Sequence, residues 1–335
     1  MTKSKIEWTE HTWNPVRGCT KISPGCKHCY AETFAERWRG VPGHPYEQGF
    51  DLRLVPEKLA EPLRRRKPTT WFVNSMSDLF HEDIPNEYIA AVFGVMAATP
   101  HHTYQVLTKR AERMPEWFRW YEGTSGAGAS AAAAMWAAEE TMKRLGDMDP
   151  NNPPPWPLDN VHLGVSVEGP DYLERLHDLM QTPASIRWVS LEPLLAGVDI
   201  RPWLGVECNH EDAYREYDTN VWICRPCEET PILDWVVVGG ESGQRARPFD
   251  LSWARRIVVD CKAAGVPVFV KQLGDDPFLA ASVHTRTIDT DIGGARVKMT
   301  FGSFDGETTV QLRAAKGGDI SEWPEDLRVR EWPTT

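Results

Sequence analysis

The chain has 335 residues, enough for one large α/β barrel or two ordinary domains, and its 41% hydrophobic and 25% charged residues are typical of a globular protein. Its formal charge of −11 argues against a broad phosphate-binding surface, so we expect no strong electrostatic binding of duplex nucleic acid. No apolar run is long enough to cross a bilayer, and residues 1–8 lack the apolar core of a signal peptide. We therefore expect a cytoplasmic protein with no membrane partner.

Three of the seven cysteines lie close together near the N-terminus, at Cys19, Cys26 and Cys29. In a cytoplasmic protein, clustered cysteines more often bind metal than form disulfides. The two-residue gap between Cys26 and Cys29 lets two thiolates reach a common metal or cluster, and a cubane cluster held by three thiolates leaves one iron free. A zinc site with a distant fourth ligand and simple apolar packing are the alternatives.

Beyond these cysteines the sequence alternates between helix and strand. After a possible first strand near residues 12–15, strands are expected at 70–74, 103–107, 161–167, 186–191, 235–238 and 266–270. Helices are expected at 56–66, 86–98, 171–180 and 251–264. Short apolar strands separated by helices pair in parallel and are buried on both faces. The pattern predicts an α/β fold, a partial or full (β/α) TIM-like barrel over residues 1–274.

Two insertions and a different C-terminal pattern interrupt this rhythm. Residues 123–159 contain an Ala-rich stretch, 127–145, expected as a crossover helix or a surface excursion, and residues 197–231 carry cysteines. Two polar, strand-like stretches with glycines nearby, 285–289 and 296–301, predict a hairpin in a β-rich C-terminal cap that covers residues 275–335.

Polar residues follow six of the expected strands, at 75–78, 108–110, 168–169, 192–193, 239–243 and 271–272. In a parallel barrel the carboxyl ends of the strands meet on one face, where active sites are built. We therefore expect these residues to share a site, and we expect the cysteine segment to lie at the same face. Glu168 and Lys271 are expected to serve as caps or surface ion pairs.

A second cysteine group lies in the insertion at 197–231 and comprises Cys208, His210, Cys224 and Cys227. Two short-spaced ligand pairs in a loop-like segment fit a small zinc knuckle. An auxiliary iron–sulfur cluster and unliganded thiols are the alternatives. Cys261, alone within the expected helix 251–264, is expected in the core.

Several of these motifs carry a family resemblance. The Trp-Asn-Pro-x-x-Gly-Cys-x6-Cys-x2-Cys-Tyr-Ala-Glu run at residues 13–32 is accompanied by Asn-Ser-Met-Ser-Asp at 74–78, Leu-Thr-Lys-Arg at 107–110, Leu-Glu-Pro at 191–193 and Gly-Gly-Glu-Ser-Gly at 239–243. With them the chain resembles the phage and prophage three-cysteine-motif family of unknown function, whose members resemble radical S-adenosylmethionine (SAM) enzymes. The resemblance spans residues 13 to about 274. The gap of six residues between the first two cysteines is longer than the three usual in that superfamily.

The resemblance implies that Cys19, Cys26 and Cys29 each bind one iron of a [4Fe-4S] cluster and that SAM chelates the fourth. An external electron donor would reduce the cluster, and the resulting 5′-deoxyadenosyl radical would abstract hydrogen from an unknown substrate, a small molecule or a nucleic-acid derivative.

The resemblance also implies roles for residues at the strand ends. Ser75, Ser77 and Asp78 would contact the amino group of SAM, and Lys109 its carboxylate. Glu192 and Glu241 would hold ribose hydroxyls or substrate, which makes them the candidate catalytic residues.

Two other interpretations stay open. In the first, the protein is a non-catalytic binding protein stabilised by zinc, in which Cys26, Cys29, Cys224 and Cys227 form one site and Cys19 is spare. In the second, the protein is a nucleic-acid-modifying or repair lyase within the radical class.

Overall fold

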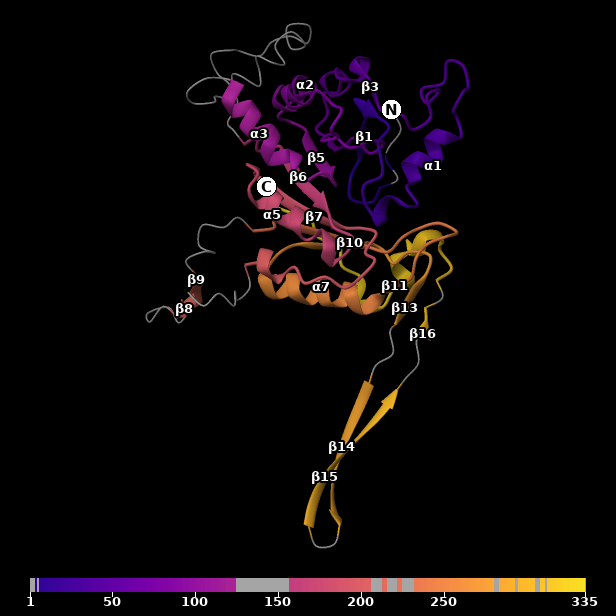
Figure 1. Ribbon diagram of the computed structural model, residues 1–335, viewed down its shortest axis with the longest axis vertical. Helices are drawn as coiled ribbons and strands as arrows, with labels where there is room; N and C mark the ends of the chain where they lie inside the picture. The colour runs from indigo at the N-terminus through magenta and orange to yellow at the C-terminus, as the bar shows by residue number, and fades with distance from the viewer. Residues whose placement is uncertain are drawn as a thin grey trace.

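The computed structural model describes residues 4, 6–124, 157–205, 213–215, 222–224, 232–279, 283–292, 295–304, 308–310 and 312–334. Its centre is a seven-stranded sheet in which every neighbouring pair is parallel and which curls into a half-barrel (Figure 1). In spatial order its strands are β1 (His11–Trp13), β4 (Thr70–Val73), β5 (Thr103–Thr108), β6 (Val161–Ser166), β7 (Ile186–Leu191), β10 (Trp235–Gly239) and β12 (Val268–Gln272). Spatial order follows chain order, which confirms the predicted α/β fold with a partial TIM-like barrel.

Helices pack against the outer face of this sheet: α2 (Asn86–Ala97), α3 (Arg113–Thr124), α5 (Glu174–Met180) and α7 (Leu251–Ala264). Helix α7 has the bounds that the sequence predicts because both ends carry clear signals. The Asp250 side chain accepts a hydrogen bond from the Ser252 N–H at its start, and Gly265 adopts a left-handed φ of 70° at its end.

The strands alternate between this outer layer and the concave inner face. On β5, for example, Tyr104 and Val106 belong to the outer core. The inner face carries a separate aromatic cluster that includes Trp8, Phe72, Trp188 and Trp235. The Trp8 ring lies 4.7 Å from that of Phe72 and 5.3 Å from that of Trp188, between ring centroids. The N-terminal segment thus fills the bottom of the half-barrel, and we call this cluster the floor.

Two predicted helices differ in the structure. Residues 56–66 form two short 3-10 turns, η2 (Pro56–Lys58) and η3 (Pro62–Arg64), instead of one α-helix. Pro62 lacks the N–H that an α-helix needs at that point, and its ring would clash with the preceding turn. The helix predicted at 171–180 opens as the 3-10 turn η4 (Pro170–Tyr172) and becomes α-helical only in α5.

Smaller elements surround the sheet. Helix α1 (Tyr30–Glu36) follows the 3-10 turn η1 (Pro24–Cys26), and β2 (Val16–Arg17) pairs with β3 (Arg53–Leu54). Strands β11 (Phe249–Asp250), β13 (Pro277–Leu279) and β16 (Thr308–Thr309) form a small sheet, and β8 (Ala213–Arg215) pairs with β9 (Trp222–Cys224). Further 3-10 turns are η5 (Arg201–Trp203), η6 (Ala315–Gly317), η7 (Ile320–Glu322) and η8 (Glu325–Leu327).

The C-terminal strand phrases form the predicted antiparallel hairpin, β14 (Val283–Ile292) with β15 (Ala295–Phe304), which extends away from the body (Figure 1). The Ala-rich stretch 127–145 lies outside the described residues. Among the helices that the structure describes, none is both long and apolar enough to span a membrane.

Candidate functional site

A cavity of about 480 Å³ opens at the carboxyl ends of the strands. Its lining includes residues at or just after the carboxyl ends of six strands of the sheet, β4, β5, β6, β7, β10 and β12, whereas the predicted residues 168–169 are not part of the lining. The candidate residues that line it are Cys19, Cys26, Cys29, Ser75, Ser77, Asp78, Lys109, Glu192 and Glu241. Trp8 and Phe72 of the floor also line the cavity, so its base is apolar and its mouth is polar. We call it the mouth cavity.

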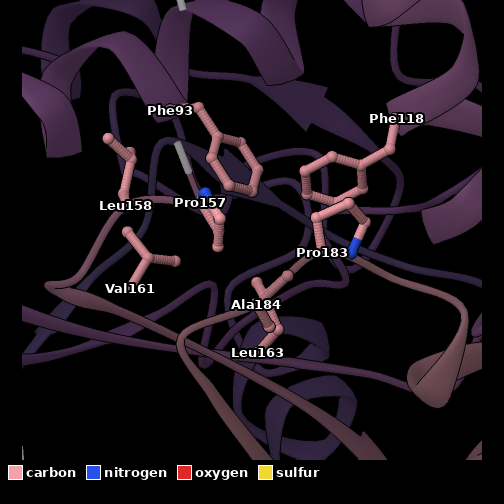
Figure 2. A pocket seen from close by; sticks show the side chains of 8 residues that line it. All are labelled: Phe93, Phe118, Pro157, Leu158, Val161, Leu163, Pro183 and Ala184. Carbon is pink, nitrogen blue, oxygen red and sulfur yellow. The ribbon is translucent and has the colours of Figure 1, made fainter. Parts of the chain in front are cut away.

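A second hollow lies on the outer face of the sheet and is of a different kind. Figure 2 shows Phe93 of α2, Phe118 of α3 and Val161 of β6 among the side chains around it, and all eight are apolar. Its volume of about 10 Å³ is close to that of a single water probe. It is therefore a packing defect between the helices and the sheet rather than a ligand site.

The three cysteines reach the mouth cavity from one stretch of chain. Cys19 follows Gly18, whose left-handed φ of 81° brings its backbone against the Asp51 carbonyl, where no Cβ would fit. Cys26 ends η1, and Cys29 directly precedes α1.

Burial shapes the acidity of these thiols. It raises the pKa of Cys19 to about 12 and also raises the pKa of Cys29, and the charge of nearby Cys26 adds to both effects. Such thiols bind as thiolates when a metal supplies positive charge. Within the described part of the chain, no three His, Cys, Asp or Glu side chains converge on one point that a single metal ion would fill. A cubane cluster does not require such convergence, because each thiolate binds a different iron.

Arg110 links Cys19 to the strand ends. Its guanidinium donates to Cys19 Sγ at 3.3 Å, to the Thr20 carbonyl at 3.1 Å and to Glu82 at 2.7 Å. It also lies 3.4 Å from Asp78, whose carboxylate accepts from the Thr108 hydroxyl and from the backbone N–H of Lys109. Asp78 is thus fully engaged in holding the end of β5.

The serines expected to contact SAM are also engaged with the protein. The Ser75 hydroxyl donates to Asn14 Oδ1 at 3.2 Å, and the Ser77 hydroxyl donates to the Val16 carbonyl at 2.9 Å. Both bonds fasten the end of β4 to the segment that leads into Cys19.

Asn74 is the residue of this segment that sequence reasoning left without a role. Its side chain lines the mouth cavity and is only 3% exposed, yet neither its amide nitrogen nor its oxygen has a hydrogen-bond partner among the residues that the structure describes. Its φ of 58° lies in the left-handed region, which Asn tolerates better than most residues. A buried amide without partners is costly unless a ligand completes its bonds.

Two lysines stand at the cavity wall. Lys109 Nζ donates to the Ser166 hydroxyl at 2.5 Å and lies 3.6 Å from Glu168. Lys271 pairs with Glu192 at 2.6 Å, and both side chains are largely buried. Lys271 is therefore part of the cavity wall rather than a surface cap.

Glu168 also differs from the expectation of a surface ion pair, because it is 1% exposed. It accepts from Arg175 at 2.8 Å and from the backbone N–H of Gly25 at 3.2 Å. Burial alone would raise the pKa of Glu168, but the charges of Lys109 and Arg175 outweigh burial and lower it. The two cations that face this carboxylate therefore favour its ionised form.

The second cysteine group is described only in part. Cys208, His210 and Cys227 lie outside the described residues, as does the predicted zinc knuckle that they would form. The backbone of Cys224 ends β9, and Figure 1 shows β9 on the other side of the molecule from α1. Cys261 is fully buried within α7, as predicted.

The chain is thus an α/β protein built on a parallel half-barrel, with a cysteine segment and a cavity at the carboxyl ends of its strands. The family model for proteins of unknown function named DUF5131 matches residues 3–301, and the chain belongs to that family. No curated protein and no solved structure matches the chain significantly.

Proposed function

We propose that this protein is a cytoplasmic radical SAM-type iron–sulfur enzyme that abstracts hydrogen from a small-molecule or nucleic-acid-derived substrate. The observation that carries the proposal is the position of three half-buried thiols along one cavity at the mouth of a parallel half-barrel. Cys19, Cys26 and Cys29 would hold a [4Fe-4S] cluster, and SAM would occupy the adjoining space. We also propose that the protein is related to the phage and prophage three-cysteine-motif family.

The residues present fit these groups. Thiolates are the usual ligands of iron–sulfur clusters, and the mouth cavity is within the size range of cofactor pockets. The unpartnered amide of Asn74 faces this cavity and supplies one donor group and one acceptor for a polar ligand. When bound, the cluster and SAM would supply one-electron cleavage of the sulfonium and a 5′-deoxyadenosyl radical.

The chain's own residues would bind and orient the ligands. Lys109, fixed by Ser166, provides an ammonium group for the SAM carboxylate. Glu192 and Glu241, which follow the neighbouring strands β7 and β10, also line the cavity, where they would hold ribose hydroxyls or substrate. The apolar floor around Trp8 keeps water from the base of the cavity, as radical chemistry requires.

Anaerobic reconstitution tests the proposal. Protein treated with iron and sulfide under reducing conditions should turn brown and hold about four irons per chain. Cys26→Ala should abolish this, whereas Cys261→Ala, which alters a core cysteine of α7 away from the mouth cavity, should not. Reduced by an external electron donor, the loaded protein should slowly convert SAM to 5′-deoxyadenosine.

The competing interpretation, a zinc-stabilised binding protein without catalysis, predicts the opposite result. Colourless protein that carries only zinc after reconstitution would rule out the radical SAM proposal. Zinc found together with a full iron complement would instead assign zinc to the second cysteine group.

A further inference from the structure

We infer that Glu168 and Glu241 position the cysteine segment over the mouth cavity by clamping residues 24–28 from two sides. Neither residue acts as a cluster ligand in this inference, and each works through other groups. Glu168 follows β6 and Glu241 follows β10, so the clamp ties the segment to two separate strands of the half-barrel.

The cysteine segment needs such a clamp because it has almost no apolar anchorage. None of residues 20–28 is buried, and η1 contributes no residue to the core. Segments of this kind fluctuate unless polar contacts to a rigid scaffold hold them. Arg110 supplies such contacts at Thr20, and the two carboxylates supply them over residues 24–28.

Glu168 forms the first side of the clamp. Its Oε1 accepts the Gly25 N–H at 3.2 Å while its Oε2 pairs with Arg175 at 2.8 Å. The approach is so close that a Cβ on Gly25 would lie 2.8 Å from Glu168 Oε1. The backbone of the segment therefore rests directly on a carboxylate that Arg175 keeps in place.

Glu241 forms the second side. It accepts two side-chain hydrogen bonds from Arg247, at 2.6 and 2.9 Å, and the backbone N–H of Arg247 at 2.9 Å. Arg247 in turn donates to the Pro24 carbonyl at 2.9 Å, and His28 Nδ1 lies 3.2 Å from Glu241. Glu241 is 7% exposed, so its own charge-assisted bonds are largely shielded from water and therefore strong, whereas Arg247 reaches Pro24 nearer the surface.

The consequence for chemistry rests on the proposed function. A cubane cluster fixes the spacing of its thiolates, so a segment that wanders by about 1 Å binds it poorly. The clamp would hold Cys26 at a fixed distance from Cys19 and Cys29. Two carboxylate charges near the cluster would also make it harder to reduce.

Hydrogen exchange on the metal-free full-length protein tests the clamp itself. The variants are Glu168→Ala, Glu241→Ala and Arg247→Met, the last at a partly exposed position where folding is least at risk. Each should speed exchange of the amides in residues 20–29 about tenfold or more, because charge-assisted bonds to the segment are lost. The peptide spanning α7 should exchange as in the wild type.

The matched control is Asp260→Ala, which removes a carboxylate of similar burial that pairs with Arg256 at 2.8 Å within α7. It should leave residues 20–29 unchanged. If the amides of residues 20–29 exchange at the wild-type rate in folded Arg247→Met and Glu241→Ala proteins, the inference is overturned. Equal acceleration in the segment and in α7 would also overturn it, since that marks global destabilisation.

A second measurement separates this inference from the proposed function. In reconstituted Glu241→Gln protein that retains full iron, the reduction potential should be less negative than in the wild type, a change that a merely structural role would not produce. Wild-type protein that never binds iron would refute the proposed function while the exchange result still decides the clamp. If the wild type holds a cluster and the Glu241→Gln variant has the same reduction potential, the electrostatic part of the inference is refuted.

Discussion

The buried imidazole of His162 makes the stability of this protein sensitive to acid. His162 is 4% exposed, and neither ring nitrogen has a hydrogen-bond partner within the described part of the chain. Burial lowers its pKa from 6.5 to about 4. The unfolded chain therefore takes up a proton below pH 6.5 that the folded protein accepts only near pH 4. At about 1.4 kcal/mol per pH unit, this difference corresponds to about 3 kcal/mol of stability, present above pH 6.5 and lost as the pH falls to 4.

Urea unfolding at pH 7.5 and pH 4.5 measures this effect. The His162→Gln variant should lose about 2 to 3 kcal/mol less than the wild type between the two pH values. His101→Gln, which alters an exposed imidazole, should behave as the wild type does. If His162→Gln and the wild type lose the same amount of stability, His162 is not held in its neutral form by burial and the reasoning fails.

Two further predictions concern glycines whose Cα is closely packed. Gly25→Ala should cost about 1 to 3 kcal/mol in urea unfolding and lower iron retention, because its Cβ would press on Glu168. Gly164→Ala should cost at least as much, since its Cβ would overlap the buried Trp188 ring, but cluster assembly in protein that folds should be unaffected. Gly169→Ala, which has only Ala196 Cβ nearby at 3.8 Å, is the control for both and should stay within about 0.5 kcal/mol of the wild type. A Gly25→Ala protein as stable as Gly169→Ala would contradict the close contact with Glu168.

Local signals explain which elements the sequence predicts well. The strands of the half-barrel are short apolar runs bounded by polar residues, and α7 has a capping Asp250 and a terminal Gly265, so few alternatives compete. Residues 56–66 have helical apolar spacing, but Pro62 interrupts the backbone hydrogen bonds of a helix. The spacing of apolar residues indicates which face of a segment is buried, whereas a proline determines whether its backbone can form a continuous α-helix.

The sequence predicts those features of the site that follow from the topology of the sheet, but not its individual long-range contacts. Because the strands are parallel, their carboxyl ends lie on one face, and the structure places the polar residues of five of the six predicted strand ends around one cavity. The contact between Gly25 and Glu168 joins residues 143 positions apart, so no local pattern shows it. A surface cap and a buried clamp look identical in the sequence, because both are a carboxylate after a strand.

Residues 74–78 fall into two groups, those that support the cavity wall and one that is available to bind a ligand. Three side chains of this segment make hydrogen bonds within the protein: Ser75 to Asn14, Ser77 to the Val16 carbonyl, and Asp78 to the end of β5. These bonds hold the cavity wall and the residues that precede Cys19 in place. Asn74 differs from these three residues, because its amide is buried at the cavity and has no hydrogen-bond partner in the described ranges of the chain. Since a folded protein rarely leaves such a group unpaired without a use for it, we expect ligand recognition at this strand end to depend on Asn74, with its neighbours acting as the support that aims it.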